Sequence, residues 1–399
     1  MINDFDIKIA TKFVFGRGAE KKVGNELAEI GASTVLLHYD GGDYLSKSGL
    51  LDIVRTSLNE AGLDICELGG VQPNPRLSLV RKGIALCREK GVDAIVALGG
   101  GSTIDSAKAI GLGAADEMGG DVWDYFTGVR EPKSTVPVAA IVTCPASGSE
   151  SSQVVVVNND GEHAKLLVSL PVVRPAIAIM DPELSLSLPA GPTACGLVDM
   201  FCHVAERYFT DDDDFGILDR MSEGAMRSIV ELGPRLMANL HSYEFRSEAM
   251  WAATVAQNNS LGMGRNQDWS THALSNELSA VYDMPHGKTI SALMCSWMRY
   301  VCAANPVRFR RFAEKVFCIR SEGRDDLDIA NEGIDACEDW FQELGMPVSL
   351  AETGVDAEGI SRMLDAVEFY GSDSAIGSVK RLRRDDCAAI FRMACEPKG

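Results

Sequence analysis

The sequence predicts an α/β domain with a parallel sheet over residues 1–186, followed by an all-helical domain over residues 187–399. Three observations predict this fold class. In the first part, short apolar runs alternate with segments of helical periodicity, which is typical of βαβ units. A glycine-rich turn at residues 99–101 joins one such run to a helical segment. From Pro189 onward, long segments have helical periodicity and almost no alternating pattern occurs.

The first part contains several runs with the apolar content of strands. Asn158-Asn159-Asp160-Gly161 separates two of these runs and has the turn chemistry of a β-hairpin. Helices are expected at 49–61 and 77–90. A glycine directly follows each of them, at positions 62 and 91. The expected strands are 34–39, 94–98, 136–143, 153–157, 164–170 and 176–180.

The glycine turn has the features of a phosphate cradle. The buried run that ends at Leu98 leads into Gly99-Gly100-Gly101-Ser102, and a helix is expected to follow. Glycines let the backbone approach a phosphate closely, and a helix start directs free N–H groups and its positive dipole end at an anion. Ile104 stands where the third glycine of the G-x-G-x-x-G fingerprint would be, so a plain strand-to-helix turn is the alternative.

The second part reads as a succession of helices. Their apolar residues recur at three and four positions, which is the period of an amphipathic helix. The expected helices are 194–209, 219–231, 248–262, 268–282, 288–303, 306–316, 329–344, 360–367 and 385–395.

Composition and charge exclude several classes of partner. The 399 residues carry a formal charge of −19, which argues against binding to nucleic acid or to an anionic membrane. No apolar run reaches the roughly 18 residues that span a bilayer, and the N-terminus lacks the pattern of a signal peptide. The eleven cysteines form no C-x-x-C pair. We therefore expect reduced core thiols in a cytoplasmic protein.

Four residues of the helical part form a candidate metal site. Asp199 and His203 are four apart, so a helix places both on one face. His272 and His286 follow, fourteen residues apart, and the whole chain has only six histidines. One carboxylate and three imidazoles suit Zn²⁺ or Fe²⁺ and leave room for a substrate oxygen. The alternative is an Asp–His pair within a helix and two unrelated core histidines.

Several segments together resemble the iron-containing (group III) alcohol dehydrogenase family, most closely its butanol-dehydrogenase-like branch. The resemblance extends over essentially the whole chain, and the order and spacing of the segments are more specific than any one of them. The shared segments are Phe13-Val14-Phe15-Gly16-Arg17-Gly18, Gln72-Pro73-Asn74-Pro75, Gly99-Gly100-Gly101-Ser102 with Asp105 and Lys108, Thr143-Cys144-Pro145-Ala146-Ser147-Gly148-Ser149-Glu150, Val198-Asp199 with His203, Trp269-Ser270-Thr271-His272, and Tyr282-Asp283-Met284-Pro285-His286-Gly287.

The resemblance implies a Rossmann-like domain that binds NAD(P), an all-helical domain, and a divalent metal in the cleft between them, as in the dehydroquinate synthase-like fold. It implies a homodimer that exchanges hydride between a nicotinamide and a primary alcohol or aldehyde, with the metal stabilising the alkoxide. The implied metal ligands are Asp199, His203, His272 and His286. The implied cofactor residues are Asn74, Gly99, Gly100, Gly101, Ser102, Asp105, Thr143, Ser147, Ser149 and Lys165.

The sequence also departs from the family pattern. Asn276 stands where relatives carry a further histidine one helical turn after His272, and Ser147 replaces the usual threonine. Asp40 follows the strand at 35–39, where a carboxylate would accept a hydrogen bond from the adenosine 2′-hydroxyl and repel a 2′-phosphate. We therefore expect NAD to be preferred over NADP, with Asp43 as the alternative residue for this role.

Two other functions remain open on the sequence. A metal-dependent lyase or synthase of the dehydroquinate synthase type would share the fold, but it would need several cations around a polyanionic substrate. Arg207 and Arg265 are the nearest candidates for such cations. A binding protein without catalysis is suggested by Asn276, because an amide cannot transfer protons near neutral pH. The natural alcohol and the choice between iron and zinc are not determined by the sequence.

Overall fold

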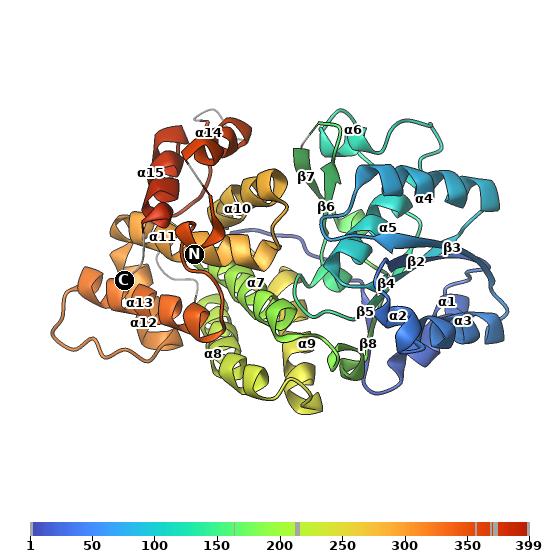
Figure 1. Cartoon of the computed structure of the whole chain (residues 1–399), viewed down its shortest axis with the longest axis horizontal. Coiled ribbons are helices and arrows are strands. Elements are labelled where there is room, and N and C mark those ends of the chain that lie inside the picture. Colours follow the sequence, from blue (N-terminus) through green and yellow to red (C-terminus); the bar gives the residue numbers. More distant parts are fainter. Residues whose placement is uncertain are drawn as a thin grey trace. The chain divides into compact units, whose positions relative to one another are not determined.

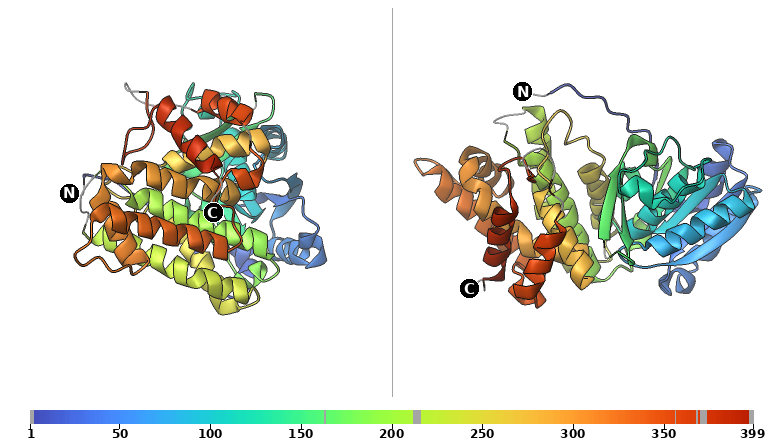
Figure 2. Two further views of the ribbon diagram at one scale, coloured as in Figure 1. Left: turned by 60° about the vertical axis from the view of Figure 1, so that its left-hand side comes forward. Right: turned by 90° about the horizontal axis from the view of Figure 1, so that it is seen from above.

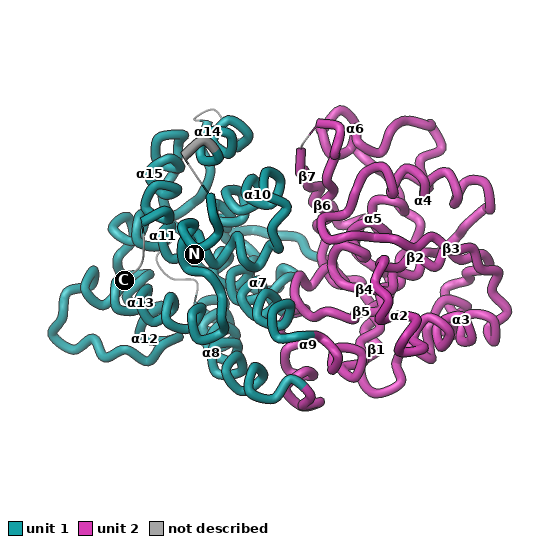
Figure 3. Tube along the Cα trace, in the orientation of Figure 1, with its two compact units in different colours: residues 1–7, 189–240, 255–399 teal, residues 8–188, 241–254 magenta. Residues whose placement is uncertain are grey.

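The structure is a computed structural model that describes residues 3–162, 164–211, 216–355, 357–367, 369 and 374–396. The chain divides into two compact units (Figure 3). The sheet unit contains residues 8–188 and 241–254, and the helical unit contains residues 1–7, 189–240 and 255–399. The boundary expected at residue 186 is a single cut and stays a prediction. Most of helix α9 (Tyr243–Gln257) is grouped with the sheet unit, although it lies after residue 186 in the sequence. A single boundary cannot assign it to that unit.

The sheet unit is built around six parallel strands. Apolar residues fill every position of the two central strands β4 and β5, so both are completely buried, as expected for a sheet covered on both faces. Each edge strand has at least two exposed positions. The spatial order is β1 (Lys12–Phe15), β8 (Ile177–Met180), β5 (Val138–Val142), β4 (Ala94–Gly99), β2 (Thr34–Asp40) and β3 (Asp64–Val71).

Helices cover both faces of this sheet (Figure 1). Alternate residues of a strand point to opposite faces, so Leu36 packs in one apolar cluster and Val35 in the other. The first cluster includes α4 (Leu77–Lys90) and α5 (Gly101–Ala114). The second includes α1 (Val23–Glu29) and α3 (Leu50–Glu60). The expected parallel α/β domain is thereby confirmed.

Shorter elements complete the sheet unit. The predicted hairpin is present as the antiparallel pair β6 (Val154–Asn159) and β7 (Ala164–Ser169). Two short helices, α2 (Tyr44–Lys47) and α6 (Trp123–Phe126), lie in connecting segments. The remaining turns are 3-10 helices η1 (Ala19–Lys22), η2 (Ser149–Ser151), η3 (Pro171–Val173) and η4 (Pro182–Ser185).

The helical unit packs its helices side by side, as the views in Figure 2 show. Helix α7 is buried along almost its entire length and packs against α8 and α11. Helix α11 also packs against α10. None of the helices among the described residues combines the length and apolarity needed to cross a membrane. The helices are α7 (Ala190–Tyr208), α8 (Ile217–Ala238), α10 (Ser270–Tyr282), α11 (His286–Val301), α12 (Pro306–Val316), α13 (Asp326–Glu343), α14 (Ala357–Ala366) and α15 (Arg384–Cys395).

Candidate functional site

Helix α7 presents two of the predicted metal ligands from its buried face. Asp199 and His203 are one turn apart, and the Nε2 atom of His203 lies 3.8 Å from Oδ1 of Asp199. Apolar neighbours on α7, such as Val198 and Phe201, anchor the helix in the core of the unit. Both polar side chains are therefore held inside the protein by a helix that cannot rotate without exposing apolar surface.

Helices α10 and α11 bring the other two predicted ligands to the same carboxylate. His272 is the third residue of α10, and His286 is the first residue of α11. Asp283 has a left-handed conformation with φ 49° at the end of α10, which turns the chain between the two helices. The Nε2 atom of His272 lies 3.9 Å from Asp199 Oδ1, and that of His286 lies 3.7 Å from it.

These separations fit a shared cation better than direct hydrogen bonds. Three imidazole nitrogens at 3.7–3.9 Å from one oxygen are too far away for hydrogen bonding. Two tetrahedral ligands, each about 2.1 Å from a zinc-sized ion, lie about 3.4 Å apart. Ligand atoms of Asp199, His272 and His286 all lie within 4.8 Å of one another. His203 is outside that set of three, although its ring stacks on His272 with centroids 4.7 Å apart.

Burial decreases across the four residues in a definite order. The side chains of His203 and Asp199 are 5% and 8% exposed, whereas His272 and His286 are 13% and 28% exposed. Burial also lowers the pKa of His203 well below its usual value, which keeps the ring neutral, as a metal ligand requires. His286 is therefore the most accessible of the four side chains.

Glu206 is a further residue of the candidate site, and it was not identified from the sequence. Its completely buried carboxylate accepts hydrogen bonds from Nδ1 of His272 and from the backbone N–H of Thr271 at 2.6 Å. A carboxylate on Nδ1 fixes the tautomer that directs Nε2 at a metal. Burial raises the pKa of Glu206 to about 8. The spacing of residues 199, 203 and 206 on one helix face was the available signal.

Trp269 and Arg207 contact His272 and His203. Trp269 has a left-handed backbone with φ 62°, which is rare for an aromatic residue and marks a position held by its surroundings. Its ring lies 5.0 Å from that of His272, and the Arg207 guanidinium lies 4.5 Å from the Trp269 ring centre. Arg207 also donates to the backbone carbonyl of His203 at 2.8 Å. The start of α10 and the middle of α7 are thus joined through one indole ring.

Asp268 fixes the chain just before this tryptophan. Its carboxylate accepts from the backbone N–H groups of Ser270, Ser378 and Val379, at 3.1, 2.7 and 2.9 Å. Burial raises its pKa to about 6. The first turn of α10 is therefore tied to a distant segment of the helical unit.

In the sheet unit, the predicted cradle forms at the carboxyl end of β4. Gly100 is the residue before α5, and the backbone passes directly from strand to helix. A Cβ added to Gly99 would lie 2.4 Å from Oγ1 of Thr103, and one added to Gly101 would lie 2.3 Å from Oγ of Ser147. A side chain at either position would therefore force a neighbouring side chain to move. Gly100, Gly101 and Ser102 are half-buried at the helix start, where N–H groups have no partner within the helix.

Asp40 and Thr143 lie on either side of this turn and share a partner. The Tyr44 hydroxyl donates a hydrogen bond to Oδ2 of Asp40 at 2.6 Å. The hydroxyl oxygen of Tyr44 also lies 2.9 Å from Oγ1 of Thr143. Burial and the hydrogen bond to Asp40 raise the pKa of Tyr44, so the hydroxyl keeps its proton. Asp43, the alternative to Asp40, is exposed and forms an ion pair with Lys47 at 3.3 Å. Tyr44 was not singled out from the sequence.

Asp105 and Ser149 are held in a buried network around Lys108. Ser149 donates to Asp105 at 2.5 Å and accepts from Lys108 at 2.7 Å. The second oxygen of Asp105 accepts from the backbone N–H of Val156 at 3.1 Å. Burial lowers the pKa of Lys108 to about 8. The network fixes the segment that contains Ser147, and contact of Asp105 or Ser149 with a cofactor stays a prediction.

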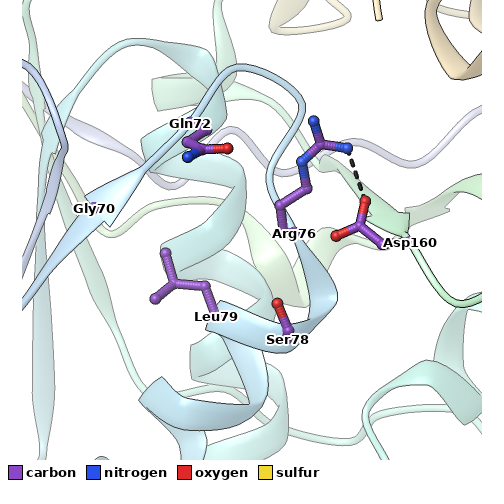
Figure 4. Close-up of a pocket in the computed structure, with 6 residues that line it drawn as sticks. All are labelled: Gly70, Gln72, Arg76, Ser78, Leu79 and Asp160. Carbon is purple, nitrogen blue, oxygen red and sulfur yellow. Dashed lines mark hydrogen bonds and ion pairs between the residues drawn. The ribbon is translucent and has the colours of Figure 1, made fainter.

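Asn74 and Lys165 are brought together although they are distant in sequence. Lys165 on β7 donates to Oδ1 of Asn74 at 3.2 Å. Next to them, Arg76 forms an ion pair with Asp160 at 2.9 Å, which joins the turn of the hairpin to the segment after β3. This pair lies at a surface hollow of about 460 Å³ (Figure 4), which is also lined by Gly70, Gln72, Ser78 and Leu79.

Comparison with known proteins covers the whole chain. Residues 10–182 match the iron-containing alcohol dehydrogenase family, and residues 193–395 match the C-terminal domain of the Fe-containing alcohol dehydrogenases. A probable NADH-dependent butanol dehydrogenase of Bacillus subtilis is 37% identical over 96% of this chain and 97% of that protein. The NADPH-dependent aldehyde reductase YqhD of Escherichia coli is 34% identical, covering 93% of this chain and 94% of that protein. The crystal structure of NADH-dependent butanol dehydrogenase A from Thermotoga maritima has a TM-score of 0.94 at 34% identity and covers 99% of both chains.

Proposed function

Because this chain belongs to the iron-containing alcohol dehydrogenase family, we propose that Asp199, His203, His272 and His286 hold a divalent metal at which a primary alcohol or aldehyde binds, and that the hydride partner is NAD. The reaction class, oxidoreduction of alcohols and aldehydes with a nicotinamide cofactor, follows from the family. The ligand set, the choice of cofactor and the substrate are the parts proposed here.

The observation that carries the proposal is the arrangement of three imidazole nitrogens around one oxygen of Asp199, at 3.7–3.9 Å. When bound there, a divalent cation acts as a Lewis acid on the substrate oxygen and favours the alkoxide over the alcohol. Glu206 orients His272, and Arg207 with Trp269 keeps α7 and α10 in register. The more exposed edge of His286 leaves room for the substrate.

The metal is iron or zinc, because both accept three imidazoles and one carboxylate. The donor set contains no thiolate, so a soft metal such as Cu(I) is not favoured. Elemental analysis of protein purified without added metal distinguishes iron from zinc.

The cradle after β4 is proposed to bind the pyrophosphate of the cofactor. Gly100, Gly101 and Ser102 supply backbone N–H groups at the start of α5, a helix of 14 residues. Asn74 and Lys165 form a pair that would contact the nucleoside parts. Thr143 and Ser147 would line the same site from the segment after β5, with Asp105 and Ser149 next to them.

Preference for NAD over NADP is proposed from the position of Asp40. Its Oδ2 lies 3.2 Å from where a Cβ of Gly99 would be, so the carboxylate stands directly at the glycine turn. Its negative charge at that place would repel a 2′-phosphate, whereas a ribose 2′-hydroxyl can donate to it.

A homodimer in the cytoplasm completes the proposal. Within the described part of the chain, β1 pairs with a strand on one side only. Its last residue Phe15 is 44% exposed, and the nearby Trp251 is 45% exposed. Their rings lie 6.4 Å apart and form an apolar patch that a second copy could cover. Among the described residues, the eleven cysteines form no disulfide, and thiols of this kind are suited to a reducing compartment.

The two cations considered for the lyase alternative are both engaged with other groups of the protein. Arg207 is stacked on Trp269 and donates to the carbonyl of His203. Arg265 is completely buried, 3.2 Å from Asp219. Neither guanidinium is directed at a polyanionic substrate, so the dehydrogenase is the favoured function.

The experiment that tests this function measures metal content and turnover on the same preparation. We expect about one iron or zinc per chain and aldehyde-dependent oxidation of NADH, with a lower kcat/KM for NADPH. Butanal and other aliphatic aldehydes form the substrate panel, and an acidic cyclic substrate tests the lyase. Turnover of the acidic substrate alone, or a higher kcat/KM with NADPH, would contradict the proposal.

A further inference from the structure

We propose that Tyr44 is a positioning residue for cofactor specificity, whose hydroxyl holds the Asp40 carboxylate at the place where the adenosine 2′-position binds. The inference rests on the proposed preference for NAD. Tyr44 lies in the segment after β2. Through Asp40, it would help the cofactor site to distinguish a ribose hydroxyl from a ribose phosphate.

The first step of the argument is the fixed orientation of Asp40. Oδ1 of Asp40 accepts from the backbone N–H of Gly42 at 2.9 Å, and Oδ2 accepts from the Tyr44 hydroxyl at 2.6 Å. With one donor on each oxygen, rotation of the carboxylate about its last bond breaks both hydrogen bonds. A carboxylate has about four acceptor positions, so each oxygen can still accept from a ribose hydroxyl.

The second step is the location of the tyrosine hydroxyl above the glycine turn. In the sheet, β4 lies between β2 and β5. Asp40 ends β2, Thr143 directly follows β5, and the Tyr44 hydroxyl contacts both residues. The backbone N–H of Thr143 also donates to the carbonyl of Gly99 at 3.1 Å. The phenol therefore joins the two strand ends on either side of the cradle.

The third step is the surroundings of the tyrosine. Its ring packs on the backbone of Gly42, since a Cβ there would lie 2.8 Å from the ring. The residue is 37% exposed, so the ring is held on one side and accessible on the other. Lys47, the only nearby cation in this segment, forms an ion pair with Asp43 at 3.3 Å. Asp40 is therefore the charge that this segment places next to the turn, and the hydroxyl of Tyr44 fixes its position.

The consequence for specificity has two parts. NAD(H) gains from an acceptor that is already oriented, because no side-chain freedom is lost on binding. NADP(H) is rejected because the carboxylate cannot turn away from the 2′-phosphate without breaking its two hydrogen bonds. Loss of the Tyr44 hydroxyl should weaken the binding of NAD(H) and reduce the repulsion of NADP(H). Both changes reduce the discrimination between the two cofactors.

The test compares Tyr44→Phe with Tyr39→Phe in the full-length protein. Tyr39 is a neighbouring tyrosine whose hydroxyl donates to Glu67 at 3.2 Å, away from the turn, so its variant is the matched control. Equilibrium titrations with NADH and NADPH, followed by cofactor fluorescence, give the two dissociation constants without turnover. Thermal unfolding of each variant checks that the fold is intact.

We expect Tyr44→Phe to raise the dissociation constant for NADH about fivefold, because the Asp40 side chain must then be ordered on binding. The ratio of the NADPH to the NADH constant should fall at least about fivefold. Steady-state kinetics should show a higher KM for NADH with little change in kcat. The control should keep both constants and their ratio.

Two results would overturn the inference. One is an unchanged ratio in Tyr44→Phe, and the other is an equal change in both variants. Failure of the proposed function is distinguishable from these, since the unmodified protein would then bind neither cofactor or would favour NADPH.

Discussion

The two candidate sites are built from different parts of the chain. The candidate metal centre consists of side chains presented by three helices, with three imidazoles 3.7–3.9 Å from Asp199. The nucleotide cradle consists mainly of backbone, and its most restrictive feature is that a Cβ at Gly101 would lie 2.3 Å from Ser147. The metal site depends on the side chains that are present, whereas the cradle depends on the absence of side chains at its glycines.

This difference predicts how each site fails. Loss of a ligand leaves a gap that no neighbour on a rigid helix can fill, so the effect on metal binding is nearly complete. An added methyl group in the cradle can be accommodated partly by movement of Ser147, a short side chain. Substitutions should therefore have all-or-none effects in the metal centre and graded effects in the cradle.

The largest effect is expected from His272→Ala and His286→Ala. Each removes one of four donors, so metal and turnover should both be lost almost completely. Metal per chain and aldehyde-dependent NADH oxidation are the measurements. His241→Ala, an exposed histidine of the sheet unit, is the control and should keep both. Full metal occupancy in His286→Ala would show that this histidine is not a ligand.

A smaller effect is expected from Glu206→Gln, because it removes an orienting group and leaves all four ligands in place. The amide can present its N–H₂ to Nδ1 of His272, which disfavours the tautomer that faces the metal. Metal affinity should fall by about 10–100-fold in a chelator competition. Glu231→Gln on the exposed side of α8 is the control. Equal affinities in the two variants would argue against a role for Glu206.

The cradle is tested by Gly101→Ala. The added Cβ requires Ser147 to move, which widens the turn and weakens the pyrophosphate contacts. The dissociation constant for NADH should rise about tenfold, a graded loss of one or two hydrogen bonds to a charged group, while metal content stays normal. Gly224→Ala on exposed α8 has open space around it and provides the control. Unchanged NADH binding in Gly101→Ala would place the pyrophosphate elsewhere.

The smallest change is expected from Asn276→His, one helical turn after His272 and half-buried on α10. The new imidazole should add a titration near its ordinary pKa of about 6.5. Alcohol oxidation, which needs a proton acceptor, should rise with pH through this value, whereas aldehyde reduction should fall. We expect changes of a few-fold in kcat, with metal content unchanged. Superimposable pH profiles for Asn276→His and the unmodified protein would exclude a proton-handling role at this position.

In the six-stranded sheet, the strands that were predicted from the sequence are the four inner ones, and the separate hairpin was predicted as well. Strands β4 and β5 are buried at every position, so their apolar runs are unbroken. The edge strands β1 and β3 were missed because half-exposed strands carry mixed residues, and β3 contains Gly69 and Gly70. Helix α9 shows a second limit, since its periodicity predicts a helix but not the compact unit with which it is grouped.

The candidate ligands could be found from the sequence because helical spacing and family resemblance both identify them. Glu206 had the correct spacing but was overlooked, because carboxylates at helical spacing are common and only burial distinguishes this one. Tyr44 could not be found in this way. Its role depends on the conformation of residues 40–44, which no periodic pattern encodes, and on Thr143, which is 99 residues away in the chain.

The indole of Trp269 should give the proposed metal centre an optical signal of its own. Its ring lies 5.0 Å from a candidate ligand ring, in a chain with five tryptophans. An open-shell ion such as Fe²⁺ provides an excited indole with non-radiative decay routes, whereas the filled d shell of Zn²⁺ does not. Emission from this one residue should therefore differ between the iron and zinc forms. The left-handed conformation that places Trp269 against His272 would thus also report which metal the proposed site holds, without a label and without turnover.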